Sequence, residues 1–318
     1  MQKCYLDHLM ESREFYFDKL VLKGINNIPV IKFYNSEIIG AETCLFHRDM
    51  SCGGDYFEML HTFINEGLSA GNAAPVVRFA DGEYAFYANN LHCNGLYQQA
   101  ESVEAIEKAM PIHIKALKGL NRSGKIAPVI YPGNIQHKKK VLFPFFLKSK
   151  IKDSAIKFLD FLFDNQIYLS RDNYLPFFVV YAYLTSKRFL EIVDDKKLCI
   201  ISSKCNLPFC QQWFSQFNSN PNITFTEIPD SYVATQWGSI KEKVLNSIPK
   251  DTDLCLVGAG VGALLVCVDV AEKFSIPAID AGHVLNIMNG QEYKSNGPRL
   301  YTIWNTDEYK INRKNGEN

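Results

Sequence analysis

The sequence predicts an α/β fold in which a layered, mostly parallel sheet is covered by helices on both faces. From residue 75 onward, short apolar runs alternate with longer segments in which apolar residues recur every three or four positions. Strands joined by crossover helices produce this alternation. Hydrophobic residues make up 47% of the 318-residue chain and charged residues 21%, so the chain has enough apolar surface for a full core.

The alternation is clearest in the last third of the chain. Expected strands there span 198–201, 223–228, 254–257 and 276–279, and expected helices span 208–217, 239–248 and 263–274. The same pattern predicts strands at 76–79 and 126–131 and helices at 102–120 and 154–163. Ligands of such sheets bind beyond the carboxyl ends of the strands, so each strand end is a candidate site.

The predicted catalytic domain spans residues 71–309. Residues 1–70 are expected to form an N-terminal extension of mixed helix and strand, with a helix at 5–22 and a strand at 28–33. A glycine-containing stretch from 67 to 75 separates the two parts. The polar residues 310–318 are expected to form a frayed tail.

Charge and cysteine content exclude several classes of protein. With 34 basic and 34 acidic residues, the chain lacks the positive surplus of a dedicated nucleic-acid binder. The nine scattered cysteines are typical of a reduced cytoplasmic protein, and Cys205 and Cys210 fit no common zinc pattern and are interpreted as incidental thiols. The most apolar run, 254–268, is shorter than the ~20 residues of a spanning helix. We therefore expect a soluble, cytoplasmic protein.

The first candidate site follows the strand at 76–79. Asp81 and Glu83 flank Gly82, an arrangement that lets both carboxylates converge on one point if the chain turns there. Paired carboxylates suit Mg²⁺ or Mn²⁺, and one of them is alternatively a general base. Arg78, just upstream, is a candidate phosphate-binding residue. An ordinary Asp-Gly turn without chemistry is the competing interpretation.

The second candidate site follows the strand at 254–257. Gly258, Gly260 and Gly262 precede a predicted helix, where exposed backbone N–H groups favour an anion. Asp280 ends the next strand, where a Rossmann-like unit places a ribose-binding acid. His283 follows it as a candidate for phosphate contact or proton transfer. Glycines that merely allow tight packing are the alternative.

Together these two segments resemble the GT-D glycosyltransferases. The resemblance covers about residues 75–305 and rests on an Arg-Phe-x-Asp-Gly-Glu element and a glycine-containing unit that runs into Asp-x-Gly-His, matched here by Arg78, Phe79, Asp81, Gly82, Glu83, Gly258, Asp280, Gly282 and His283. Ser202 stands at a strand end that in this family faces the nucleotide. Ala80 departs from the pattern, because glycine is usual at that position.

The resemblance implies transfer of a sugar from a nucleotide-sugar donor, UDP-linked, to a glycan, glycolipid or glycoprotein acceptor. A divalent metal, Mn²⁺ or Mg²⁺, held by Asp81 and Glu83 would assist departure of the diphosphate. Arg78, the backbone of 258–262 and His283 would steady that diphosphate, and Asp280 would bond a ribose or sugar hydroxyl. The catalytic candidates are thus Asp81, Glu83 and His283.

Two further hypotheses stay open. The Gly258–Gly262 loop also fits an NAD- or SAM-dependent Rossmann-type enzyme, although that function leaves Asp81 and Glu83 without a role.

The second hypothesis concerns residues 137–152, where six lysines surround an apolar centre. A solvated basic flank is the preferred interpretation of this segment. Contact with an anionic membrane surface, at the inner membrane face, is the alternative.

Overall fold

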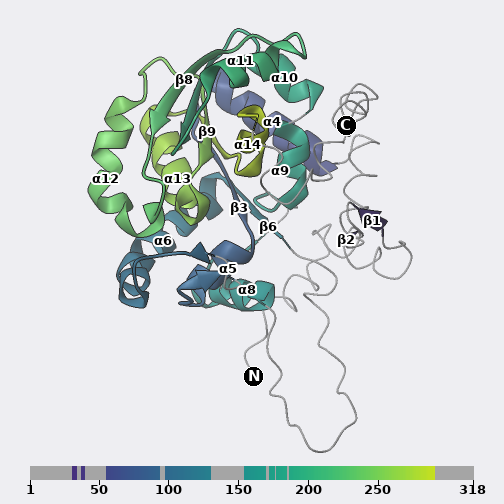
Figure 1. The fold of residues 1–318 in the computed structure, drawn as a ribbon. Coiled ribbons are helices and arrows are strands. Elements are labelled where there is room, and N and C mark those ends of the chain that lie inside the picture. The colour runs from purple at the N-terminus through teal and green to yellow at the C-terminus, as the bar shows by residue number, and fades with distance from the viewer. Residues whose placement is uncertain are drawn as a thin grey trace, which may run out of the picture.

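The computed structural model describes residues 31–33, 37–39, 55–93, 97–129, 154–169, 172–175, 177–184 and 186–290. At its centre is a six-stranded sheet of order β6-β3-β10-β9-β7-β8, in which all neighbouring strands are parallel (Figure 1). The strands are β3 (Ala74–Phe79), β6 (Lys125–Pro128), β7 (Lys197–Ser202), β8 (Asn222–Glu227), β9 (Leu254–Gly258) and β10 (Pro277–Asp280). This sheet confirms the predicted α/β, parallel fold class.

The neighbouring inner strands β3 and β10 come from distant parts of the described chain. Ile279 of β10 lies opposite Val76 of β3 on one side and Leu256 of β9 on the other. Every residue of β3 and β10 is buried. Strands covered on both faces need continuous apolar runs instead of alternation, and the two runs meet that need.

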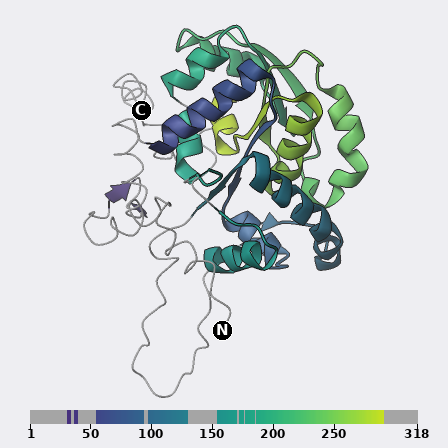
Figure 2. The ribbon, with the colours of Figure 1, turned by 180° about the vertical axis from the view of Figure 1, so that it is seen from behind.

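Helices cover both faces of the sheet (Figures 1 and 2). One face carries α6 (Val103–Ser123), α12 (Val233–Ser247) and α13 (Ala263–Phe274). The other carries α4 (Asp55–Ala70), α9 (Phe177–Leu184), α11 (Leu207–Ser215) and α14 (His283–Met288), with α10 (Lys187–Val193) against α9 and α4. Crossovers are right-handed. The helices α6, α12 and α13 each lead to a strand nearer the β6 edge of the sheet, and they therefore share one face. Helix α11 leads the other way, from β7 to β8, and therefore lies on the other face.

Several short elements gather beyond the carboxyl end of β3. There α5 (Asp81–Tyr87) contacts α8 (Ser154–Asp164), the hairpin strand β4 (His92–Cys93) and the 3₁₀ turn η2 (Gly260–Gly262). The partner of β4 in its hairpin is β5 (Tyr97–Gln98). A separate antiparallel pair is formed by β1 (Ile31–Phe33) and β2 (Glu37–Ile39).

The expected elements of the last third all appear, and one boundary differs from the predicted one by more than two residues. Helix α12 begins at Val233, six residues before the predicted start, after Tyr232 in a left-handed conformation. A larger difference lies at Asp81–Gly82, where the expected turn is the first turn of helix α5. Helix α9 is apolar on nearly all sides and offers no periodicity by which the sequence would reveal it.

Part of the expected N-terminal extension lies against the sheet. Helix α4 contacts β3 and β10, and a Cβ atom on its Gly67 would lie 2.9 Å from side-chain carbons of Ala74 and Pro277. The expected helix at 5–22, the basic segment at 137–152 and the tail at 310–318 lie outside the described residues. Within the described part of the chain, none of the helices is both long and apolar enough to cross a membrane.

Candidate functional site

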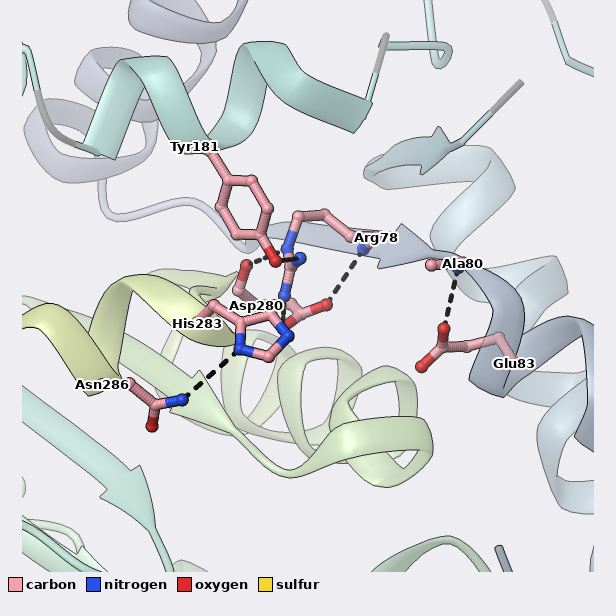
Figure 3. Close-up of polar contacts among 7 residues, drawn as sticks. All are labelled: Arg78, Ala80, Glu83, Tyr181, Asp280, His283 and Asn286. Carbon is pink, nitrogen blue, oxygen red and sulfur yellow. Dashed lines mark hydrogen bonds and ion pairs between the residues drawn. The ribbon is translucent and has the colours of Figure 1, made fainter. Parts of the chain in front are cut away.

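An ion pair joins the carboxyl ends of the neighbouring strands β3 and β10 (Figure 3). Arg78 Nη2 lies 2.6 Å from Asp280 Oδ1, and Arg78 Nε donates to the Asp280 carbonyl oxygen at 2.8 Å. The backbone N–H of Arg78 donates to Asp280 Oδ2 at 3.2 Å. Each side chain is only 7% exposed. Both carboxylate oxygens are therefore engaged by Arg78, through its side chain and its backbone.

Helix α9 contributes two aromatic side chains, Tyr181 and Phe177, to this cluster. Arg78 Nη1 donates to the Tyr181 hydroxyl, and the guanidinium carbon lies 4.2 Å from the centre of the Tyr181 ring and 5.0 Å from that of Phe177. Burial by itself lowers the pKa of Arg78, but the Asp280 carboxylate outweighs it and the pKa is raised. Burial raises the pKa of Asp280, and the guanidinium opposes this. The two opposite charges therefore stabilise each other.

Gly282 is required by this close packing. Its φ is +44°, and a Cβ atom built there would lie 1.9 Å from Arg78 Nη2. Glycine both adopts the positive φ and leaves the space that the guanidinium fills. His283 begins α14 directly after it, and its Nδ1 lies 3.4 Å from Asn286 Nδ2 (Figure 3).

The acidic pair Asp81 and Glu83 lies in the first turn of α5, where carboxylates are favourable to the helix dipole. Glu83 Oε2 accepts the backbone N–H of Ala80 at 2.8 Å, and Cys93 Sγ donates to Asp81 Oδ2 at 3.5 Å. Instead of converging through a turn at Gly82, the two carboxylates thus engage different partners. Ala80 is extended, with φ −135°, so this backbone does not require the glycine that is usual in the family.

The two acids also differ in their surroundings. Asp81 is exposed. Glu83 is partly exposed as a residue, but its carboxyl group is crowded by protein atoms, and this burial raises its pKa to about 7. Among the described residues, no group of three or more His, Cys, Asp or Glu side chains is arranged to hold a metal ion. Both carboxylates are hard oxygen donors, but the structure does not bring them together on one point.

The three glycines after β9 have different structural roles. A Cβ on Gly258 would lie 2.8 Å from Leu285 Cδ1, and one on Gly262 would lie 2.7 Å from Val233 Cβ. These two glycines therefore permit close packing of α14 and α12. Gly260 has φ +51° and nothing within 4 Å of such an atom, so its backbone stands in open space beside α5 and α12. Ser202, which pairs with Gly258 in the sheet, donates to the Lys204 carbonyl at 2.7 Å.

Most of the predicted residues thus share the carboxyl edge of the sheet, including Arg78, Asp280, Ser202, Gly258 and His283. The sequence analysis missed Tyr181. An apolar helix without periodicity gave no signal that its hydroxyl meets Arg78. It also missed Gln99, which continues the β4–β5 hairpin and is 7% exposed. Its Nε2 is the one buried side-chain nitrogen or oxygen without a hydrogen-bond partner in the described ranges.

A second buried polar cluster lies on the helices around α5. The His113 ring on α6 makes contacts of 3.0 Å from Nδ1 to the Tyr87 hydroxyl and 2.9 Å from Nε2 to the Ala234 carbonyl. A carbonyl only accepts, so we assign the proton to Nε2, and Nδ1 accepts from Tyr87. Burial lowers the pKa of His113 to about 4, so the ring is neutral at pH 7.

Part of the chain matches a protein-family model. Residues 163–288 match the model of the GT-D fold-like domain, a range that includes Ser202, the Gly258–Gly262 loop, Asp280 and His283 but not the Arg78–Glu83 element. No curated protein matches the sequence.

Among solved structures, two of domain of unknown function 1792 are similar. One is described as having a distinct glycosyltransferase fold, and the other is its selenomethionine-substituted form. Each has 17% identity and a TM-score of 0.46, over 80% of this chain and 92% of that one. For residues 163–288, the match to the family model confirms the resemblance to GT-D proteins that the motifs predict.

Proposed function

We propose that the protein is a glycosyltransferase that moves a sugar from a UDP-linked donor to a hydroxyl of a glycan, glycolipid or glycoprotein. The GT-D-like match over residues 163–288 is the observation that carries this proposal. The gathering of ionisable residues at the carboxyl edge supports it, because ligands of parallel sheets bind at that edge.

The first turn of α5 is the proposed metal site. Asp81 and Glu83 fit Mn²⁺ or Mg²⁺ as a donor set, because both are carboxylates and diphosphate oxygens can supply further ligands. When bound, the cation supplies positive charge next to the diphosphate as the sugar–phosphate bond breaks. Of the two, the exposed Asp81 is the better ligand, since binding an ion there leaves the interior of the protein undisturbed.

The acceptor hydroxyl must lose a proton as it attacks the sugar. A general base works best when its pKa lies near the working pH, and the pKa of Glu83 is about 7. We therefore assign Glu83 as the base whenever Asp81 alone holds the metal. His283, in the first turn of α14 at the same edge, is the second candidate for proton transfer.

Arg78 and Asp280 receive a different role from the one that the sequence suggests. Each is already engaged by the other, and Arg78 also donates to Tyr181. We propose that they position the ends of β3 and β10, and that the open backbone at Gly260 contacts the diphosphate. The same pairing disfavours the NAD- or SAM-dependent alternative, in which Asp280 would have to bond a ribose.

The test is a titration of UDP with and without Mn²⁺ on the wild type, Asp81→Ala and Asp251→Ala. Asp251 is a matched control because it is exposed and pairs with Lys197 at the opposite, amino end of β7. We expect metal-dependent binding that Asp81→Ala weakens on the order of tenfold to a hundredfold and Asp251→Ala leaves unchanged.

The same samples are then screened with other nucleotide-sugars, NADH and SAM by thermal shift. Stabilisation by another nucleotide-sugar, with the same dependence on Asp81, would change only the donor. Stabilisation by NADH or SAM alone would overturn the transferase assignment.

A further inference from the structure

Two cysteines lie against each other where β7 runs into α11. Cys205 lies in the segment before the helix, Cys210 lies within it, and their sulfur atoms are 3.7 Å apart. Cys210 is buried, whereas Cys205 is half-buried. The other free cysteines that the structure describes, Cys93, Cys199, Cys255 and Cys267, are all buried. Within the described ranges, Cys205 is thus the thiol that an oxidant in solution reaches most readily.

The contact between the two thiols makes them chemically unequal. The contact with Cys210 lowers the pKa of Cys205, and the contact with Cys205 raises the pKa of Cys210. The thiolate is the reactive form of cysteine. The more accessible sulfur is therefore also the more nucleophilic one, and a second thiol lies in contact with it.

We propose that Cys205 and Cys210 are an oxidisable pair that forms a reversible intramolecular disulfide with hydrogen peroxide. The Cys205 thiolate attacks one peroxide oxygen and the O–O bond breaks. Cys205 becomes a sulfenic acid, and the departing hydroxide takes up a proton to form water. Cys210 sulfur then attacks Cys205 sulfur, so that the S–S bond forms and the S–O bond breaks. The hydroxide released takes the Cys210 proton as a second molecule of water.

The local structure leaves room for this bond. A disulfide needs sulfur atoms about 2.05 Å apart, so the two must approach by roughly 1.6 Å. Cys210 is fixed in α11, but Cys205 follows Ser203 and Lys204 in a segment outside the helices and strands. Rotation of the Cys205 side chain with a small shift of this segment closes the gap without displacing the sheet.

The pair is also connected to the candidate functional site. Asn289, just after α14, accepts the backbone N–H of Asn206 at 2.6 Å and the Cys210 thiol at 3.5 Å through its Oδ1. Oxidation consumes that thiol proton and removes one of these two bonds. Helix α14 begins with His283 at its other end, so the oxidation state of the pair alters a contact of the helix that carries a candidate site residue.

The sequence makes the test direct. No Lys or Arg lies between Cys205 and Lys241, so trypsin releases both cysteines in one peptide, 205–241. The reduced full-length protein is treated with hydrogen peroxide, its remaining thiols are alkylated under denaturing conditions, and peptides are weighed with and without reductant. We expect peptide 205–241 to be unalkylated and lighter by two hydrogen atoms, and to regain two alkylation sites after reduction.

Three variants sharpen the result. Cys205→Ser should abolish the oxidation, and Cys210→Ser should leave Cys205 as a sulfenic acid that dimedone traps. Cys267→Ala, a buried thiol of α13, should still form the bond. The proposal is overturned if the folded protein keeps both thiols reduced under peroxide, or if peptide 205–241 becomes linked to another peptide instead.

Discussion

Two buried polar clusters lie near the end of β3, and they are stabilised in opposite ways. Arg78, Asp280 and Tyr181 join β3, β10 and α9 through full charges, whereas Tyr87, His113 and the Ala234 carbonyl join α5, α6 and α12 through neutral groups. Both are closed to water. The first cluster depends on keeping two opposite charges together, and the second depends on keeping a titratable ring uncharged.

This difference has a consequence for how each part of the protein responds to change. A charge removed from the first cluster leaves its partner buried and uncompensated. Protonation of His113 in the second cluster creates a buried positive charge without a counter-charge. The first cluster should therefore be sensitive to substitutions that remove a charge, and the second to acid pH.

Removing a charge from the first cluster should have the largest effect. Asp280→Asn leaves the Arg78 guanidinium buried without its counter-charge, and we expect a loss of about 3–5 kcal/mol in the free energy of unfolding. Denaturant unfolding followed by circular dichroism measures it. Asp251→Asn, in the exposed pair with Lys197, should leave the midpoint unchanged.

A double variant tests whether charge is the cause. Replacing both members, Arg78→Met with Asp280→Leu, should recover part of the stability lost by Asp280→Asn, because no isolated charge remains. Equal losses in the single and double variants would mean that shape, and not charge, governs this cluster.

The second cluster should show itself in acid. The pKa of His113 is about 4 in the folded protein, against an ordinary value of 6.5. The unfolded chain therefore binds a proton first as the pH falls. The contribution of His113 is fully present above pH 6.5 and is lost progressively toward pH 4, by about 3 kcal/mol in total.

The measurement is the free energy of unfolding between pH 7 and pH 4 for the wild type and His113→Gln. We expect the variant to be less stable at pH 7 but to have a shallower slope in this window. His92→Gln, at an exposed position, should keep the slope of the wild type. An unchanged slope in His113→Gln would show that the ring is not kept neutral.

The smallest expected effect is a difference between two glycine substitutions. Gly260 and Gly282 both have a positive φ, but their surroundings differ. Gly260→Ala introduces only backbone strain, whereas Gly282→Ala also drives a methyl group into the Arg78 guanidinium. The extra overpacking should make Gly282→Ala less stable than Gly260→Ala by about 1–3 kcal/mol. Thermal unfolding of both proteins gives the difference, and equal losses would contradict the close packing at Gly282.

The alternating part of the fold was predictable because its signals are local. Strands β7, β9 and β10 are mostly apolar runs, β8 alternates apolar and polar residues, and α13 spans 263–274 as expected. Asp81–Gly82 misled the prediction, since the same dipeptide that favours a turn also starts a helix when a residue such as Glu83 caps it. The sequence places the end of the strand at Phe79 in either case, and the contact from the Ala80 N–H to Glu83 that distinguishes a helix start from a turn is visible only in the structure.

The contacts of the candidate site were less predictable than its residues. Arg78 and Asp280 each ended a predicted strand, but periodicity does not state which strands are neighbours. Tyr181 was hidden in an apolar helix, and its hydroxyl has a partner only in three dimensions. Most of the residues at this edge could therefore be predicted from the sequence. Which of them pair with one another, and hence which position the strands and which are left to react, required the structure.

The ion pair at the end of β3 also constrains the order of events during synthesis. Arg78 and Asp280 are 202 residues apart in the chain. At translation rates of 5–20 residues per second, Arg78 waits on the order of ten to forty seconds before its partner is made. Strand β3 also lacks β10 beside it during that time. During this interval the side of β3 that will pair with β10 is exposed in the nascent protein. A chaperone that shields this side of β3 would have to act before β10 is synthesised.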